Sequence, residues 1–303
     1  TLKTEASVTK ILMDGKTHTR GVSFLNLKTG TPDLMESDVV IVCGGTIESA
    51  KLLLSSSSKD WADGIGNDSG HVGRHLIGHP VMGASAVRPG NPDKLDGELG
   101  FTSLISRHFD SPEYQHKGKM WFSGSVSSNS SLERQILSNV SRADMDAILL
   151  SEMRISLGGE MEQFESPENR VSLGSGTTRH GLPTTEIEVG IHEINIKTRQ
   201  EHVQTFVEIL KTAGCREDSI ESYAGDPDGA HASSTCRMSS SDVDGVVDPD
   251  LQVHGTDNLY VCSNAVFPSI AAANPTLTVS ALAVRLAEHI GEQSSLVPLS
   301  GSH

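Results

Sequence analysis

The sequence predicts a mixed fold, α/β in one part and α+β in the other. Glycine is abundant, with 29 residues in 303, and 36% of the residues are hydrophobic. This composition is typical of a loop-rich α/β protein rather than of a helical bundle. A continuous apolar run at 38–45 that ends in two glycines predicts a strand buried on both faces of a parallel sheet. Short segments in which polar and apolar residues alternate, at 169–173 and 185–191, predict strands with one solvent-exposed and one buried face.

The first 80 residues predict a hairpin followed by a strand–helix unit. Apolar and polar residues alternate over 6–28 around a turn at Asp14–Gly15, and the alternation slips by one residue, which indicates a bulge. The apolar run is followed by a predicted helix at 46–55, for which Thr46 is the expected N-cap. Residues 56–80 are rich in Gly, Ser, Asp and His and predict a long connection.

The remainder of the chain predicts further helices and extended segments. The clearest amphipathic helix is at 196–214, where apolar residues repeat at helical spacing. The other predicted elements are a strand at 120–126, a helix at 131–153, a polar loop at 223–229, extended segments at 247–253 and 259–262, and a final helix at 276–290. Pro275 falls at the first turn of that last helix, where its missing N–H has no cost.

The composition argues against nucleic acid and membrane partners. The formal net charge is −15, and the sequence has no cluster of Lys and Arg to contact phosphates. No apolar run approaches the ~20 residues that a membrane-spanning helix needs. The opening Thr1-Leu2-Lys3 leads into no apolar segment of the kind that a signal peptide requires.

The cysteines predict a reduced, cytoplasmic protein. The four are Cys43, Cys215, Cys236 and Cys262, and no two are separated as in a zinc knuckle or a CxxC motif. Each lies in or beside apolar or small residues, as buried thiols do. We therefore expect free structural thiols and a cytoplasmic location.

Two residues near the end of the chain are suited to oxidation of an alcohol. His231 lies among small residues that leave room for a ligand, and an imidazole can accept a proton near neutral pH. Its alternative role is a hydrogen bond to the turn at Asp226–Asp228. Asn274 precedes a proline, which favours an extended backbone at this position. Its alternative role is to cap the last helix, whose N-terminus would favour a bound anion in either case.

Other motifs carry weaker signals. Gly44–Gly45 after the buried strand either admits a cofactor closely or only forms a turn. A GxGxxG fingerprint for a dinucleotide does not occur in the sequence. His71, His75 and His79 recur every four residues, but glycines and Pro80 interrupt any helix there, so we predict no metal site.

Taken together, these segments resemble the C-terminal portion of the glucose–methanol–choline (GMC) family of flavin oxidoreductases. The resemblance is carried by ordered motifs that cover residues 1–80 and 225–292. They are Val39–Leu53, Ser69–Pro80, His231-Ala-Ser-Ser-Thr-Cys-Arg-Met238, Val246-Val-Asp248, Leu251–Gly255, Asn258–Val261, Phe267-Pro268 and Asn274-Pro275. The pairing of His231 with Asn274 resembles most closely the pyranose oxidases and the sugar and glycoside dehydrogenases of that family.

The resemblance implies FAD as the cofactor and two interwoven domains. Residues 1–75 and 226–292 would form parts of a Rossmann-like FAD-binding domain, and the second part would carry the catalytic pair. Residues 76–225 would form a substrate-binding domain built on an antiparallel sheet. Residues 293–303 have no periodicity and are expected to be a disordered tail.

The resemblance also implies site roles. His231 would take the hydroxyl proton of a pyranose or glycoside while hydride passes to flavin N5, with Asn274 as the second catalytic residue. Electrons would then pass to oxygen or to another acceptor. The implied cofactor-binding residues are Val8 at the adenine, Cys43 and Gly44 at the ribose, Ser263 and Asn264 at the pyrophosphate, and Pro275 and Thr276 at the isoalloxazine.

The sequence departs from the family pattern in three places. Ser234 stands where glycine is usual, and Ser263 stands where many members have aspartate. The N-terminal βαβ unit with its glycine fingerprint is missing, so we expect the other FAD-binding half to come from a second chain or a cleaved segment. Two alternatives to sugar oxidation stay open: an alcohol or sterol oxidase of the same family, and a non-catalytic chain that keeps the fold.

Overall fold

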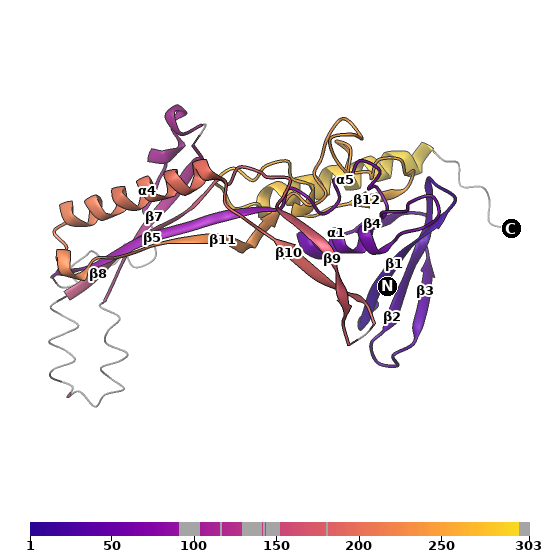
Figure 1. Cartoon of the computed structure of the whole chain (residues 1–303), viewed down its shortest axis with the longest axis horizontal. Coiled ribbons are helices and arrows are strands. Elements are labelled where there is room, and N and C mark those ends of the chain that lie inside the picture. The colour runs from indigo at the N-terminus through magenta and orange to yellow at the C-terminus, as the bar shows by residue number, and fades with distance from the viewer. Residues whose placement is uncertain are drawn as a thin grey trace.

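The computed structural model describes residues 1–90, 104–115, 117–128, 152–179 and 181–296, together with Ser141 and Ala143. Most of the helix predicted at 131–153 lies outside these residues. Within that range, Ala143 is helical, whereas Glu152 and Met153 begin a strand. No described helix is long and apolar enough to cross a membrane. Figure 1 shows an elongated molecule, with one sheet and helix α4 at one end and a second group of elements at the other.

The N-terminal elements form an antiparallel sheet in the order β1-β2-β3. The strands are β1 (Ala6–Asp14), β2 (His18–Asn26) and β3 (Pro32–Glu36). The register of β1 against β2 shifts between Val8 and Lys10 and again between Leu12 and Met13. The predicted hairpin and its bulge are therefore confirmed, whereas β3 was not predicted.

A parallel pair of strands and a helix follow. Strand β4 (Val40–Val42) pairs in parallel with β12 (Leu259–Val261), and α1 (Gly45–Ser55) follows β4. The predicted N-cap of α1 is wrong, because the cap residue is Gly44. The Thr46 hydroxyl instead donates to the carbonyl of Ala232 (2.5 Å), which ties the helix to a distant segment.

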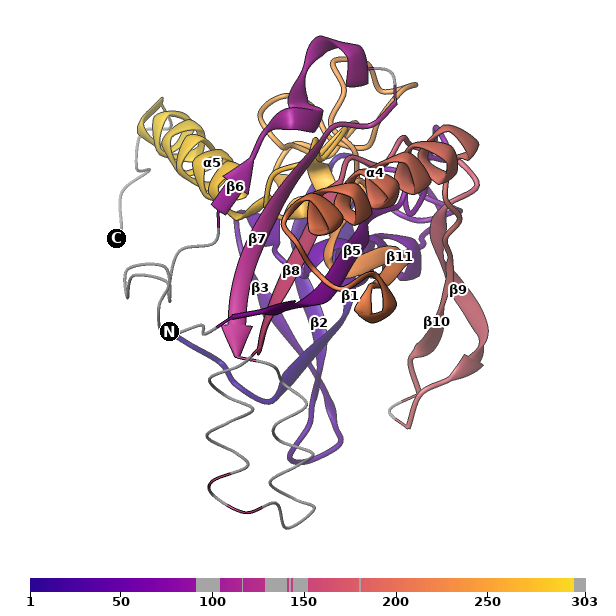
Figure 2. The same cartoon turned by 90° about the vertical axis from the view of Figure 1, so that its left-hand side faces the viewer.

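The other end of the molecule is a five-stranded antiparallel sheet in the order β11-β5-β8-β7-β6. Its strands are β5 (Ile77–Pro89), β6 (Leu104–Ser106), β7 (Met120–Ser128), β8 (Glu152–Met161) and β11 (Glu221–Ser233), accompanied by the short turns η2 (His108–Asp110), η3 (Pro112–Tyr114) and η4 (Glu217–Ser219). Helix α4 (Glu193–Thr212) lies along one face of the sheet (Figure 2). The opposite face carries a pocket that is lined by residues of β5, β7, β8 and β11.

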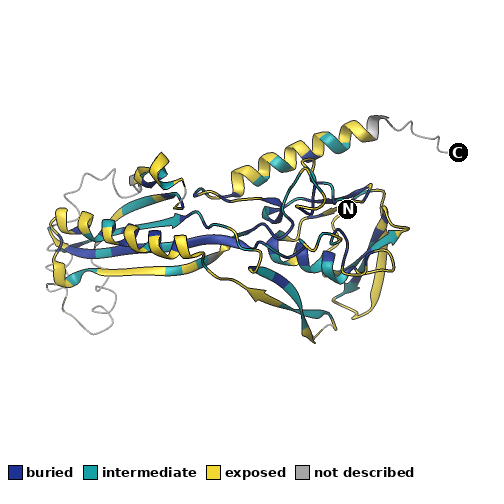
Figure 3. Ribbon diagram, turned by 45° about the horizontal axis from the view of Figure 1, so that its top comes forward, coloured by how far each residue is buried: buried dark blue, intermediate teal, exposed yellow. Residues whose placement is uncertain are grey.

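Two smaller elements complete the fold. Strands β9 (Arg170–Thr177) and β10 (Pro183–Glu188) form an antiparallel hairpin. The turn η5 (Asn264–Val266) precedes α5 (Thr276–Leu296), a helix that is exposed along most of its length (Figure 3). Helix α5 continues past the predicted boundary at 292, and the rest of the predicted tail, 297–303, lies outside the described residues.

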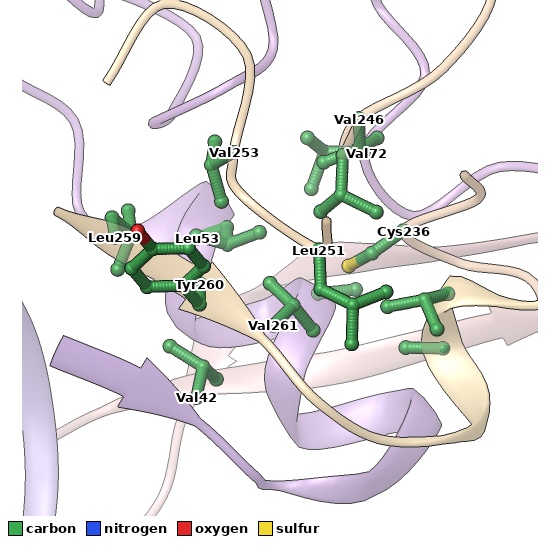
Figure 4. Packing of buried hydrophobic residues seen from close by; sticks show 14 of the residues in the cluster. Val42, Leu53, Val72, Cys236, Val246, Leu251, Val253, Leu259, Tyr260 and Val261 are labelled. Atoms are coloured by element: carbon green, nitrogen blue, oxygen red, sulfur yellow. The ribbon is translucent and has the colours of Figure 1, made fainter. Parts of the chain in front are cut away.

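The buried hydrophobic residues form two clusters. The first packs α1, β4, β12 and the loops around them (Figure 4), and its members include Leu53, Trp61, Cys236, Leu251 and Tyr260. The second lies between α4 and the five-stranded sheet, and its members include Met82, Ala84, Phe109, Phe206 and Leu210. The predicted domain boundaries at residues 75 and 225 stay a prediction.

Several sequence predictions need correction. The polar loop predicted at 223–229 is part of strand β11. The extended segment predicted at 247–253 forms only isolated bridges, such as Val247 with Val253. Ile209, one of the apolar residues in the helix predicted at 196–214, is 37% exposed and does not belong to the buried side of that helix. The strand at 120–126 and the helices at 46–55, 196–214 and 276–290 are confirmed with shifts at their ends.

Candidate functional site

An open cleft lies on the face of the five-stranded sheet opposite α4. Its volume is about 900 Å³. Side chains alternate between the two faces of a strand. Met82 and Ala86 of β5 therefore pack in the core under α4, while Val81 and Ser85 line the cleft. The sheet thus separates a hydrophobic core from an open groove.

The floor of the cleft is built from aligned rows of small residues. One row joins Ser123, Gly158 and Gly83, and the next joins Ser125, Ser156 and Ser85. These rows leave a trough along the strands, because serine and glycine fill little space above a sheet.

Two aromatic side chains rise beside this floor. Trp121 lies opposite Glu160 in the sheet, and Tyr223 lies opposite Gly83. A Cβ atom at Gly83 would lie only 2.8 Å from the Tyr223 ring, so the glycine allows that ring to cover the strand. Trp121 is 37% exposed and Tyr223 is 58% exposed.

One end of the cleft holds a compact group of ionisable side chains. The Glu160 Oε2 atom on β8 lies 3.0 Å from Nδ1 of His79 on β5 and 3.0 Å from Nδ1 of His231 on β11. The two Nδ1 atoms are 3.1 Å apart. The register between β11 and β5 shifts between Asp228 and Ser233. Such an irregularity redirects a side chain, and here it coincides with His231.

Asn274 completes the group from the segment before α5. Its Nδ2 atom lies 3.3 Å from Nε2 of His231. An amide NH₂ group can only donate, so Nε2 is the acceptor and the ring proton of His231 lies on Nδ1. That proton is directed to Glu160. The structure therefore brings together the predicted pair His231 and Asn274, and it places His231 on Glu160 rather than on the turn at Asp226–Asp228.

Burial keeps His79 neutral. Its side chain is fully buried, and desolvation lowers its pKa below the usual value, although Glu160 opposes that shift. A neutral ring with its proton on Nδ1 donates to the carboxylate. The negative charge at this end of the cleft is therefore that of the Glu160 carboxylate. Its Oε2 atom accepts hydrogen bonds from the imidazole N–H groups of His79 and His231.

The same three atoms have the spacing of a metal site, since His79, Glu160 and His231 each offer one ligand atom within 4.8 Å of the others. The tautomer set by Asn274 argues against this use, because a protonated Nδ1 of His231 has no lone pair for a metal. His71 and His75 form a separate contact, with Nδ1 of His71 2.8 Å from Nε2 of His75. The prediction of no metal stays a prediction.

Three of the predicted cofactor-binding residues line one pocket. Val8, Cys43 and Gly44 border a cavity of about 420 Å³ between β1, β4 and the start of α1. Val8 and Cys43 are both exposed, and Gly44 has no side chain to obstruct a ligand. An exposed apolar surface beside bare backbone fits the adenosine part of FAD.

The other predicted cofactor residues lie near the catalytic pair in the chain. Ser263 is buried and its hydroxyl accepts the backbone N–H of Ala265 (3.3 Å), while the Asn264 carbonyl accepts the backbone N–H of Ser234 (3.2 Å). Ser234 has φ +81°, in the region that glycine favours, which explains why glycine is usual at this motif position. Pro275 is buried and Thr276 is the first residue of α5.

Sequence reasoning missed Glu160 and the role of His79. A signal for Glu160 is present in β8. Met153, Leu157 and Met161 are buried at every fourth residue, whereas Glu160 falls on the opposite face of the strand. Strand periodicity could have placed this carboxylate in the cleft, but it could not have shown which histidine it meets.

The fold is that of flavin-dependent oxidases. The structure matches formate oxidase from Aspergillus oryzae RIB40 with a TM-score of 0.63 at 15% identity, over 97% of this chain and 61% of that one. Models of the GMC oxidoreductase family match residues 1–81 and 165–283. The chain belongs to the GMC oxidoreductase family, whose members are flavoproteins that bind FAD.

Relatives of characterised activity are similar over nearly the whole chain. One is 2-methyl-1,2-propanediol dehydrogenase from Mycolicibacterium austroafricanum, 25% identical over 97% of this chain and 55% of that protein. Another is C-glycoside 3-oxidase from Arthrobacter globiformis, 29% identical over 95% of this chain and 53% of that protein. The chain thus spans about half the length of these relatives.

Proposed function

We propose that this protein takes part in the FAD-dependent oxidation of a secondary alcohol of a sugar or glycoside to a ketone. The observation that carries the proposal is the contact between His231 and Asn274 at one end of the cleft. Bound FAD would supply the hydride acceptor, while oxygen or another acceptor would take the electrons. Val8, Cys43, Gly44, Ser263, Asn264, Pro275 and Thr276 are the residues proposed to hold FAD.

His231 and Asn274 divide the work at the substrate oxygen. The unprotonated Nε2 atom of His231 can accept the hydroxyl proton as the C–H bond is broken. The Asn274 amide, which donates to that nitrogen here, can donate instead to the alkoxide oxygen as negative charge develops. The pair thus provides one base and one donor for one oxygen atom.

The cleft supports a sugar or glycoside as the substrate. Serine hydroxyls in its floor can bond the many hydroxyl groups of a sugar, and Trp121 and Tyr223 offer faces for its apolar C–H surfaces. Glu160 at one end and Glu221 farther along disfavour an anionic substrate. The similarity to C-glycoside 3-oxidase agrees with this class.

We further propose that a segment outside these 303 residues supplies the pyrophosphate-binding glycine loop. The described surface has apolar residues suited to such a contact. Ile41 on β4 is 44% exposed, and Leu277 and Val284 on α5 are 82% and 61% exposed. Parallel strands are ordinarily covered on both faces, so a strand such as β4 is expected to be covered in the assembled protein.

An alcohol dehydrogenase or oxidase is the second candidate. The similarity to 2-methyl-1,2-propanediol dehydrogenase favours it, and the same His231–Asn274 pair would serve that reaction. A small diol bound at His231 and Asn274 would leave the end of the groove near Glu221 unused. The two candidates therefore differ in how much of the cleft the substrate fills.

Anaerobic reduction of the flavin-loaded protein tests the proposal. We expect the yellow colour to bleach with a pyranose or glycoside, and the ketone product identifies the carbon attacked. His231→Ala should slow this bleaching by roughly 10²–10⁴-fold. Bleaching by small alcohols alone would favour the second candidate. A protein that binds FAD but is reduced by none of these compounds would contradict both.

A further inference from the structure

We propose that Glu160 is a positioning residue for His231, holding the imidazole in the tautomer whose Nε2 atom is basic and supplying the counter-charge once that atom has taken a proton. The proposal rests on the proposed function, because it assigns the proton-accepting role to His231. It adds a third strand of the sheet, β8, to the catalytic group.

The first step of the argument concerns the proton on His231. Asn274 Nδ2 donates to Nε2 from 3.3 Å, so the ring proton lies on Nδ1. Glu160 Oε2 lies 3.0 Å from that Nδ1 atom and is an acceptor. The two contacts require the same tautomer, with the basic nitrogen toward Asn274 and the protonated nitrogen toward the carboxylate.

The second step concerns what holds the carboxylate. His79 lies 3.0 Å from the same Oε2 atom, has a fully buried side chain and comes from the neighbouring strand β5. Burial disfavours the charged form of His79, so this histidine donates a proton without adding a competing positive charge. Glu160 is thereby fixed by a neutral donor and stays available as the counter-charge for His231.

The third step concerns the charge that develops during the reaction. When Nε2 accepts a proton, His231 becomes an imidazolium, and its remaining Nδ1–H forms a charge-assisted hydrogen bond to Glu160. Among the described side chains around His231, the ionisable groups are Glu160 from β8 and His79 from β5, while Asn274 from the segment before α5 carries no charge. Glu160 is thus the group that can neutralise this cation.

The proposed balance involves one proton. The substrate O–H bond breaks and an Nε2–H bond forms on His231, while the Nδ1 proton stays on the ring, hydrogen-bonded to Glu160. Groups that orient a metal-binding histidine affect activity by roughly tenfold to a hundredfold when they are changed, and we expect an effect of the same order for a group that orients a catalytic histidine.

Two variants test the proposal in the flavin-loaded protein. Glu160→Gln keeps the side-chain volume and an acceptor oxygen but removes the charge. We expect flavin reduction to slow by about tenfold, and the pH below which reduction fails to move down by about one unit, because the imidazolium has lost an opposite charge. Glu160→Leu removes the acceptor as well and should slow reduction further. Glu188→Gln, which removes the charge of an exposed partner of Arg170, is the matched control and should change neither quantity.

Nitrogen NMR of ¹⁵N-histidine-labelled protein gives a readout that is independent of turnover. In the wild type, His231 should show a protonated Nδ1 and an unprotonated Nε2, and Glu160→Leu should give a mixture of tautomers. Either of two results would overturn the proposal. One is a wild-type His231 that is protonated on Nε2. The other is a Glu160→Gln variant in which the pH below which flavin reduction fails is the same as in the wild type. If no sugar or alcohol reduces the flavin, the proposed function fails, but the tautomer measurement still decides the positioning role of Glu160.

Discussion

The Nδ1 atoms of His79 and His231 lie 3.1 Å apart, although 152 positions separate the two residues in the chain. Strands β5 and β11 are neighbours in the sheet, and the irregular register of β11 brings its histidine over the cleft face of β5. Glu160, from the strand on the other side of β5, meets both rings. A single sheet therefore supplies the base, its carboxylate and the donor that fixes that carboxylate.

The donor character of Asn274 gives the first prediction. Asn274→Asp replaces an N–H donor with an acceptor, which favours a proton on Nε2 of His231 and so blocks the base. We expect flavin reduction to fall by about 10²–10³-fold at neutral pH, and by more than in Asn274→Ala, which only loses a donor. Rapid-mixing measurements of flavin bleaching provide the comparison. Equal rates in the two variants would contradict the assigned tautomer.

The glycine floor of the cleft gives a steric prediction. A Cβ atom at Gly158 would meet only the Met82 carbonyl oxygen, at 3.6 Å, which is an ordinary contact. Gly158→Leu should therefore fold normally but fill the trough between Trp121 and Tyr223. We expect KM for a glycoside to rise by about tenfold or more with little change in the melting temperature.

Gly158→Ala provides the graded control for this prediction, because a single methyl group leaves most of the trough open. KM for a small alcohol should change little in either variant. A glycoside KM that is unaffected by leucine would show that the substrate does not lie over Gly158.

Cysteine reactivity tests the position of the proposed adenosine pocket. Cys43 is exposed beside Gly44, whereas Cys236 is fully buried and burial raises the pKa of its thiol to about 12. In the flavin-loaded protein, alkylation of Cys43 should be slow, and removal of FAD should make it faster by roughly tenfold. Cys236 should stay unmodified in both states and serves as the internal control. Labelling of Cys43 at one rate with and without FAD would place the cofactor elsewhere.

The sequence allowed prediction of those elements whose own periodicity is strong. Helix α4 has an apolar stripe that packs on the sheet, and β4 is a continuous apolar run, so the existence of both was predicted from local pattern alone. The predicted burial of β4 on both faces is not observed, because Ile41 is 44% exposed. Strand β11 was predicted as a loop, because Gly225, Pro227 and Gly229 are turn-forming residues. Long-range pairing with β5 overrides that local preference.

Two of the four site residues were predicted from the sequence, and the other two depend on strand pairing that local sequence does not show. His231 and Asn274 lie in motifs that resemble a known family, so their roles could be inferred without knowing the fold. Glu160 and His79 belong to the site because β8 and β5 are adjacent in the sheet. The sequence of neither strand shows which other strand it pairs with. Charged residues are common on the solvent-exposed face of a strand, and only the pairing register of the strands shows which of them contacts a histidine.

The second core contains a titratable group that carries the last prediction. His202 on α4 is fully buried, and its ring centroid is 4.0 Å from that of Phe109. Among the residues that the structure describes, neither of its ring nitrogens has a hydrogen-bond partner. Burial, with smaller contributions from His108 and Lys117, lowers the pKa of His202 from 6.5 to about 4. The unfolded chain therefore binds a proton more readily than the folded protein does.

The sign of the pH dependence follows from linkage. Stability linked to His202 is complete above pH 6.5 and is lost as the pH falls through the window from about 6.5 to about 4, because protons then favour the unfolded state. A shift of this size corresponds to about 3 kcal/mol. His75 and His79, whose pKa values burial also lowers, add to the loss in the same direction.

His202→Phe removes both the titration and the unpaired ring nitrogens while keeping an aromatic ring against Phe109. We expect the free energy of unfolding at pH 7.5 to rise by about 1–3 kcal/mol, because two buried polar atoms without partners are gone. Its fall between pH 6.5 and pH 4 should be smaller than in the wild type by about 3 kcal/mol. Urea unfolding at several pH values measures both effects, and His18→Gln, a change at an exposed histidine, should reproduce the wild-type profile. A variant that is less stable at pH 7.5 and as acid-sensitive as the wild type would show that His202 is hydrogen-bonded in solution and does not carry this pH dependence.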